Sequence, residues 1–317
     1  MTEMLSGLDA GVRERVAVLR EQGRFFWLDV SLSETSRDDL VDALRVPERV
    51  LPALALSGDA SASRSFHADG ESVVFALRCY AESETPTDEA AFRLRPLEVR
   101  VLVTGDYLLT LHEERVSLPA VLAPDLPGER SKRYVVYAVL EAMLVTTSEA
   151  LGEVERMLDA LGMASTEGGG AHVSRETLRA AGSRLATMRR WVSAEQAVFA
   201  RIGVEIGALR GFETQDEPYF DRLYQQVNSL LASVDAAANG LAMLLDLQLN
   251  ERAYVVSVVA TIFVPLTLLT GFFGMNFGWM VDHIETPIAF WLLGFLGPIA
   301  VAVLCWRLLV RRFPIGD

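Results

Sequence analysis

The sequence predicts an α+β membrane protein, with an N-terminal α/β/α domain, a long stalk helix that continues into a membrane, and a second membrane helix near the end. Three features predict this fold class. Strand-like apolar runs lie between Asp-Gly and Gly-Asp turns in the first third, helical spacing replaces them after Pro127-Gly128, and two charge-free stretches follow. The expected segments are an α/β domain (1–128), long helices and stalk (129–252), two membrane helices (253–276 and 287–306), the loop between them (277–286) and a basic tail (307–317).

The composition narrows the classes of function. The 317 residues include 42 acids and 29 bases, a net charge of -13, which does not suit nucleic acid but is compatible with a protein that gathers cations. Only Cys79 and Cys305 are cysteines, so we expect neither a disulfide framework nor a cysteine-rich zinc site. No Walker loop, HExxH or GxSxG motif occurs, and we expect no enzyme.

The first segment alternates helix and strand patterns around one predicted sheet. Residues 3–22 predict a short charged helix, and two further short helices are bounded by Pro47 and by Ser57-Gly58. The predicted strands cover residues 25–30, 63–69, 72–80, 92–105 and 106–114.

Three long helices are predicted next. The first covers residues 131–161 and ends at Leu161-Gly162, and the second covers 174–209. The third begins near Asp216 and has no break signal before Phe273, a length of roughly 85 Å if it is helical throughout. Such a helix is too long for a compact globule, so we expect a stalk that enters the bilayer.

Two stretches of 21 residues, Ala253–Phe273 and Thr286–Trp306, contain no charged residue. As helices, each would be about 30 Å long, the thickness of the hydrocarbon core of a bilayer. Arg252 precedes the first stretch and arginines follow the second, whereas the loop between them has no Lys or Arg. The positive-inside rule therefore places both termini in the cytoplasm of a multi-pass protein of the cell inner (plasma) membrane.

The first of these stretches leads into the string PLTLLTGFFGMNF, preceded by ATIFV, which contains Gly274, Met275 and Asn276. With two C-terminal spans, this string resembles the CorA family of divalent metal transporters, whose signature is Gly-Met-Asn at the outer end of the first membrane helix. The resemblance implies a homopentamer in membrane lipid that carries Mg²⁺, with Co²⁺, Ni²⁺ and Zn²⁺ as further candidates. It also implies gating by intracellular cation.

Two helices cannot enclose a pore, so a conducting protein of this design must be a ring of subunits. One face of the first membrane helix would then line the axis, and a stripe of small or neutral residues follows helical spacing back from Asn276. Close helix packing is the other reading of this stripe. The predicted pore-lining residues are Gly271, Thr267, Val264, Ala260, Val256 (or Ser257), Ala253 and Asn250.

Asn276 is the expected cation site at the mouth. Mg²⁺ sheds its water shell reluctantly, and a ring of amide oxygens can hold the hydrated ion without binding it too tightly for conduction. The alternative is that Gly274-Met275-Asn276 only caps the helix. Apolar residues on the same face, Val264, Val256 and Ala253, would form a dry constriction that can gate by losing water.

The same stripe continues into the stalk, where Asp246 and Asp235 are candidate metal ligands and a solvated face is the alternative. The family pattern places an acid where this chain has Asn239. In the outer loop, Asp282 and Glu285 would keep the mouth negative, and His283 is either a softer ligand suited to zinc or an ordinary loop residue. Arg307, Arg311 and Arg312 would form a thin basic collar after the second membrane helix; the alternative is that they are only the positive-inside signal.

Two other functions stay open. A zinc transporter of the ZntB-like branch shares the fold implied by the resemblance, although Met275 favours the magnesium branch. A membrane-anchored sensor without conduction is the second alternative, because the expected sensing acid is missing at Asn239.

Overall fold

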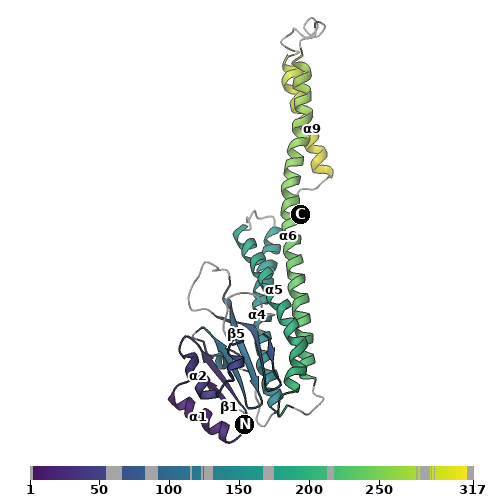
Figure 1. Cartoon of the computed structure of the whole chain (residues 1–317). Coiled ribbons are helices and arrows are strands. Elements are labelled where there is room, and N and C mark those ends of the chain that lie inside the picture. The colour runs from purple at the N-terminus through teal and green to yellow at the C-terminus, as the bar shows by residue number, and fades with distance from the viewer. Residues whose placement is uncertain are drawn as a thin grey trace. The chain divides into compact units, whose positions relative to one another are not determined.

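The computed structural model describes residues 3–54, 66–82, 92–114, 116–122, 124, 131–166, 175–212, 218–275, 278, 286, 288 and 290–312. The described residues fall into two compact units (Figure 1). The first lies within 1–164 and 171–241, and the second within 165–170 and 242–317.

A six-stranded mixed sheet organises the first unit, with the order β1-β2-β6-β5-β4-β3. β1 and β2 are parallel, as are β2 and β6, whereas the β6–β5, β5–β4 and β4–β3 pairs are antiparallel. The strands are β1 (Glu3–Ser6), β2 (Phe26–Ser31), β3 (His67–Ala68), β4 (Ser72–Glu82), β5 (Leu94–Thr104) and β6 (Tyr107–His112).

The predicted helix over residues 3–22 is wrong at its start. Glu3–Ser6 form strand β1 beside β2, with alternating exposure along the strand, and the chain then turns at Gly7, whose φ is +76°. Helix α1 (Ala10–Glu21) begins only after Asp9, whose side chain accepts a hydrogen bond of 2.8 Å from the Val12 N–H. Four residues are too few for the strand alternation to be recognised beside a helical pattern.

One face of the sheet is covered by α1, α2 (Arg37–Leu44) and the short 3₁₀ turn η1 (Glu48–Val50). Alternate residues of β2 and β6 point into this core, as the period of two in a strand requires. They are Phe26, Leu28, Val30, Tyr107, Leu109 and Leu111.

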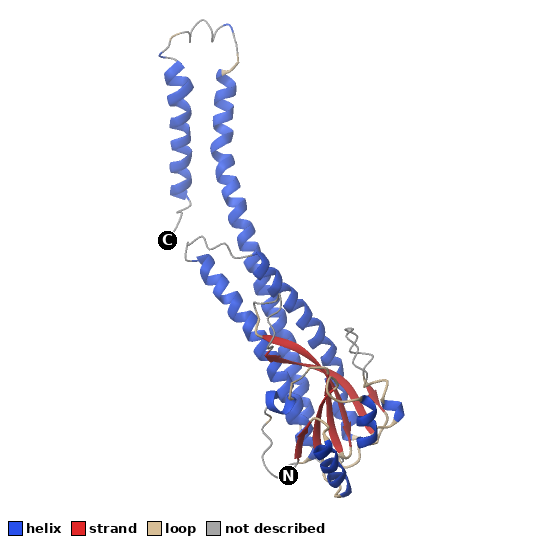
Figure 2. Cartoon of the chain, turned by 90° about the vertical axis from the view of Figure 1, so that its left-hand side faces the viewer, coloured by secondary structure: helices blue, strands red, loops and turns tan. Residues whose placement is uncertain are grey.

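Helices α4 (Lys132–Thr166) and α5 (Arg175–Gly207) lie on the other side of the sheet (Figure 2). β3 pairs with only the start of β4, and the helices satisfy main-chain groups farther along this strand. The Arg78 N–H donates to Glu195 Oε1 of α5 (2.7 Å), and the Tyr80 N–H donates to Thr146 Oγ1 of α4 (2.9 Å). These bonds close a strand edge that would otherwise be open to pairing. Because helices cover both faces of the sheet, the predicted α/β/α layering is confirmed.

α4 continues past Gly162 to Thr166, so the predicted helix end at Leu161-Gly162 is wrong. A glycine inside a helix costs only about 1 kcal/mol relative to alanine, which tertiary packing can offset. A short helix, α3 (Leu118–Leu122), precedes α4.

Helix α6 (Tyr219–Phe273) is continuous over 55 residues, as the stalk argument predicts. It contains Pro265, which has no N–H to donate within the helix. In the second unit, α9 (Gly297–Arg312) runs antiparallel to the second half of α6 (Figure 2).

The start of the second predicted membrane helix differs from the expected α-helix. Phe290–Leu296 form a π-helix, η3, directly before α9. Pro298 explains the change, because it cannot donate to the carbonyl four residues back, at Gly294, and a local π turn is one way for a helix to absorb such a residue.

Candidate ion pathway along α6

Several helical stretches of the described residues are apolar. Lys132–Met163 and Tyr219–Asn250 are long and apolar enough to cross a membrane, but 67% of the apolar window of the first is buried inside the protein, against 22% for the second. Of two shorter apolar stretches, Val256–Phe272 lies within the first predicted span, and Gly294–Arg307 lies within the second except for its last residue. The burial of Lys132–Met163 is that of a core helix of the first unit.

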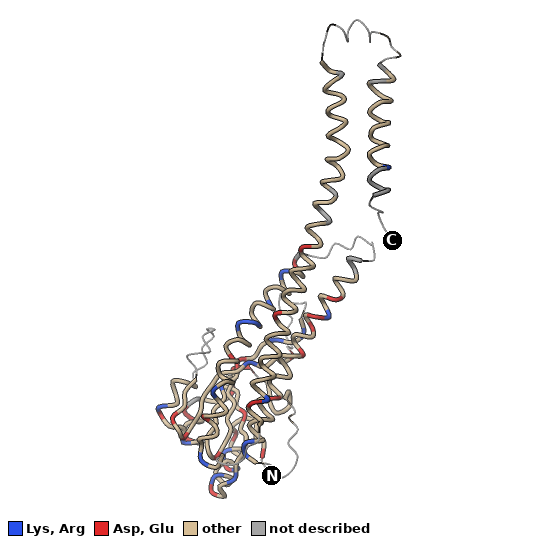
Figure 3. The backbone as a smooth tube through the Cα atoms, turned by 90° about the vertical axis from the view of Figure 1, so that its right-hand side faces the viewer, with Lys and Arg blue, Asp and Glu red and all other residues tan. Residues whose placement is uncertain are grey.

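Charge separates the two halves of α6. Acidic and basic side chains occur along its first half and cease before Ala253 (Figure 3). The second half exposes large apolar side chains, including Val256 (68% exposed), Val264 (66%) and Leu268 (74%). An apolar surface of this extent needs a cover of lipid or of other subunits.

The predicted pore-lining residues from Asn250 to Gly271 all lie on α6, and all are exposed in the single chain. Phe263 and Leu268, which we expect to face away from the axis, are exposed as well. The assignment of the pore face therefore still rests on helical spacing and stays a prediction.

Three threonine hydroxyls in this half of α6 donate to the main chain one turn back. The distances are 2.8 Å from Thr261 Oγ1 to the Ser257 carbonyl, 2.8 Å from Thr267 Oγ1 to Phe263, and 3.0 Å from Thr270 Oγ1 to Leu266. Each hydroxyl has one proton, so what remains on its oxygen is acceptor capacity. On the predicted pore face, Thr267 can therefore accept from a water of a cation's hydration shell.

Helix α6 tightens where it ends. The Gly274 N–H donates to the Thr270 carbonyl (3.0 Å), and the Met275 N–H donates to the Phe272 carbonyl (3.2 Å). A Cβ at position 274 would lie 3.1 Å from the Thr270 oxygen, so a larger residue would crowd the backbone. Among the described residues, the glycines with positive φ do not include Gly274, so it does not form a left-handed cap. Asn276, Asp282, His283 and Glu285 lie outside the described residues.

The two stalk acids have different surroundings. Asp235 pairs with Arg189 of α5, with 2.7 Å between Oδ1 and Nε. Asp246 is exposed, and no ion pair of it is found within the described ranges. Asn239 and Met243, between them on α6, are exposed too. Sequence reasoning did not find Arg189, because no local pattern on α5 marks it as a partner of Asp235.

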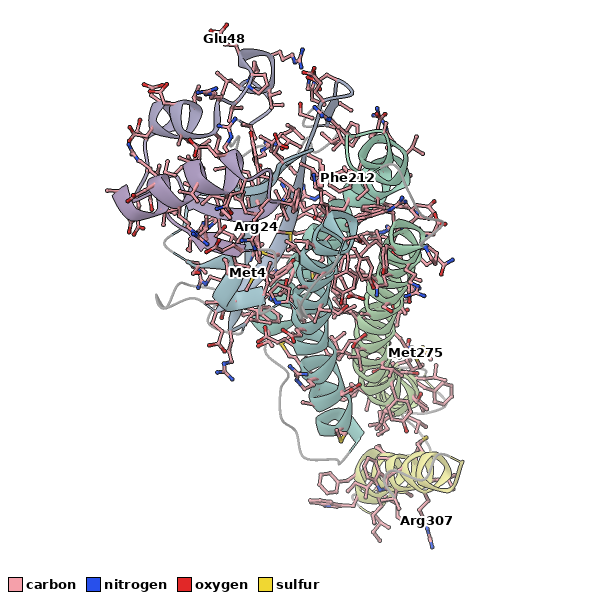
Figure 4. All side chains as sticks on the ribbon, turned by 90° about the horizontal axis from the view of Figure 1, so that it is seen from below. Met4, Arg24, Glu48, Phe212, Met275 and Arg307 are labelled. Carbon is pink, nitrogen blue, oxygen red and sulfur yellow. The ribbon has the colours of Figure 1, made fainter. Side chains whose placement is uncertain are left out.

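The structure shows no preformed metal cluster: the described residues contain no group of three or more His, Cys, Asp or Glu side chains that could hold a metal ion. Of the basic collar, Arg307 is exposed and extends away from the ribbon of α9 (Figure 4). Arg311 and Arg312 lie at the end of α9, and their side chains are outside the described set.

A mixed α/β/α unit and a long helix with a charge-free second half are the features of a membrane protein in which an α/β/α domain is followed by a helix that enters the bilayer. Comparison with known proteins identifies its family. The family described as "CorA-like Mg2+ transporter protein" matches residues 22–312. The chain therefore belongs to this family.

Individual relatives differ in the metal that their names give. The zinc transport protein ZntB of Pectobacterium atrosepticum is 25% identical over 221 residues, which cover 66% of each protein. The cobalt/magnesium transport protein CorA of Thermotoga maritima is 26% identical over 165 residues, 48% of this chain and 45% of that protein. The chain thus spans two thirds or less of either relative.

A solved structure supports the fold over almost the whole chain. The complete CorA magnesium transporter of Methanocaldococcus jannaschii superposes with a TM-score of 0.56 and 16% identity, covering 91% of both chains. At this identity the likeness shows a shared fold and leaves the transported cation open.

Proposed function

We propose that the protein is a channel for divalent cations, with Mg²⁺ as the first candidate and Co²⁺ and Ni²⁺ as further ones. The observation that carries this proposal is the continuity of α6, which runs as one helix from an acid-bearing half into a charge-free half that ends at Phe273, directly before Gly274-Met275. Membership of the CorA-like family supports it.

The charge-free half of α6 would form the first membrane span, and η3 together with α9 would form the second, with both termini in the cytoplasm. A protein with two spans can enclose a pore only as a ring, and closed cyclic symmetry is the ordinary solution for identical subunits. We propose a homopentamer, in which α6 faces the axis and the apolar residues of α9 face lipid.

Hydrated cations would bind first at the ring of Asn276 amides. The Thr267 hydroxyl uses its proton in the hydrogen bond to the Phe263 carbonyl, so its oxygen can accept a hydrogen bond from a water of a hydrated ion. This supports passage of an ion that keeps its water, because a hydroxyl proton aimed into the pore would repel the protons of that water. Deeper in the pore, Val264, Val256 and Ala253 would form an apolar constriction that closes by losing water.

Gating would come from the stalk. The carboxylates of Asp246 and Asp235 recur in every subunit of a ring and repel each other in the absence of cations. Intracellular cation would draw these helices together and close the pore. The exposure of Asp246 supports its role as a cation contact.

A zinc transporter is the second candidate, favoured by the relatives named ZntB and by His283 in the outer loop. A membrane-anchored sensor without conduction is the third. Uptake of Mg²⁺ and Zn²⁺ by liposomes that contain the purified protein distinguishes the three, since a sensor would transport neither.

A further inference from the structure

Contacts between α5 and α6 recur every seven residues along α5. Two of them are close approaches of glycine, and two are polar pairs. The two helices are antiparallel, so the numbering of α6 falls as that of α5 rises. The four pairs are Gly182–Leu241, Arg189–Asp235, Gln196–Asn228 and Gly203–Phe220.

The outer pairs hold the two helices close. A Cβ at Gly182 would lie 3.4 Å from Leu241 Cδ2, and one at Gly203 would lie 3.0 Å from Phe220 Cβ. A larger residue at Gly203 would therefore push the helices apart.

The inner pairs fix how the helices align along their length. The Gln196 side-chain N–H donates to Asn228 Oδ1 (2.6 Å) in a partly buried position. A polar pair in a helix seam specifies one register, because any other register leaves its groups without partners. One heptad along, this register places Arg189 opposite Asp235.

The Arg189–Asp235 pair is accessible to solvent. The two side chains are 63% and 41% exposed, and Nε lies 2.7 Å from Oδ1. Exposed pairs of this kind are weak and are screened by ions in solution. A hydrated divalent cation can therefore reach the Asp235 carboxylate, but only in competition with the guanidinium.

We propose that Arg189 is a built-in counter-cation of Asp235, and that it raises the Mg²⁺ concentration at which Asp235 takes up metal. This inference rests on the proposed cation-sensing role of the stalk acids. Asp246 lies three helical turns farther along α6, and no ion pair of it is found within the described ranges.

The test compares Arg189→Gln with Arg190→Gln in the full-length protein in detergent. Arg190 is the adjacent residue, carries the same charge, and contacts Thr187 on its own helix (3.4 Å), which makes it the matched control. Thermal unfolding is measured against MgCl₂ concentration at constant ionic strength, so that screening alone does not change the result.

We expect Arg189→Gln to lower the Mg²⁺ concentration for half-maximal stabilisation about two- to fivefold, in line with the loss of one exposed ion pair. Adding Asp235→Asn should remove this gain. Equal Mg²⁺ responses of the Arg189→Gln and Arg190→Gln proteins, including no response in either, would overturn the inference, as would a gain that survives Asp235→Asn. Mg²⁺ uptake into liposomes is scored separately, so a protein that binds but does not conduct contradicts the proposed function alone.

Discussion

The carboxylate of Glu195 on α5 accepts a 2.7 Å hydrogen bond from the main-chain N–H of Arg78 on β4. Glu195 is 1% exposed, and burial raises its pKa to about 7, partly opposed by the hydrogen bond and the positive charge of Arg78. The layer of helices is thus fastened to the part of β4 that β3 leaves unpaired, by a carboxyl group that titrates near neutral pH.

This group should make the stability of the first unit depend on pH. Because its pKa is higher in the folded protein than the ordinary value of 4.5, its contribution is fully present below pH 4.5 and is lost as pH rises through 7. Wild type should unfold at a lower temperature at pH 8 than at pH 5, because its free energy of unfolding falls by an amount on the order of 2–3 kcal/mol between these pH values.

Glu195→Gln should flatten this dependence and raise the unfolding temperature at pH 8. Glu205→Gln is the control on the same helix, because Glu205 is partly exposed and pairs only loosely with Arg201, at 3.9 Å. A Glu195→Gln protein with the pH profile of wild type would show that the carboxyl group does not titrate in this range.

The second prediction concerns Asn276. If its amide holds hydrated cations at the mouth, Asn276→Ala should abolish uptake and leave the oligomer intact, whereas Asn276→Asp should bind cations more tightly and slow their flux. Radiometric or dye-based uptake, with size measurement of each variant, checks both effects. Normal transport by Asn276→Ala would leave helix capping as the role of this residue.

Assembly gives the third prediction. Two spans per chain cannot line a pore alone, so the protein in detergent should form a closed cyclic oligomer, most simply with five subunits. Native mass spectrometry reads the number directly. A spectrum that contains only monomers and dimers would rule out the channel.

The fourth prediction concerns the stalk acids. Each close pair of carboxylates contributes roughly 1–4 kcal/mol of repulsion at solvent-like to surface-like dielectric, so several pairs can bias a gating equilibrium. Asp235→Asn combined with Asp246→Asn should weaken closure by high internal Mg²⁺ without abolishing conduction. Currents or uptake are recorded against internal Mg²⁺, and superimposable curves for wild type and double variant would mean that the acids form only a solvated face.

Regular periodicity explains which parts of the fold the sequence predicts well. The strands β4, β5 and β6 and the helices α4, α5 and α6 have long patterns, and each is found close to its expected position. Strand β1 was missed because its four residues carry too little pattern, and the π turn at Phe290–Leu296 because it depends on the hydrogen bond that Pro298 cannot make.

The candidate site is predictable to a smaller extent. Helical spacing places Thr267 on one face of α6, but its hydrogen bond to Phe263, which leaves its oxygen as an acceptor, is seen only in the structure. The pairing of Asp235 with Arg189 joins residues 46 positions apart and depends on the register of two helices, which no local pattern specifies.

Cation conduction is tested most directly by uptake of Mg²⁺, Co²⁺ and Zn²⁺ into liposomes, measured side by side, with and without a pH gradient, for wild type and Asn276→Ala. We predict Mg²⁺ uptake by wild type that is well above that of empty liposomes, needs no pH gradient and is lost in Asn276→Ala. Zinc uptake that depends on the gradient, with little for Mg²⁺, would instead support the zinc transporter. No uptake of any of the three cations would contradict the proposal that the protein is a channel for divalent cations.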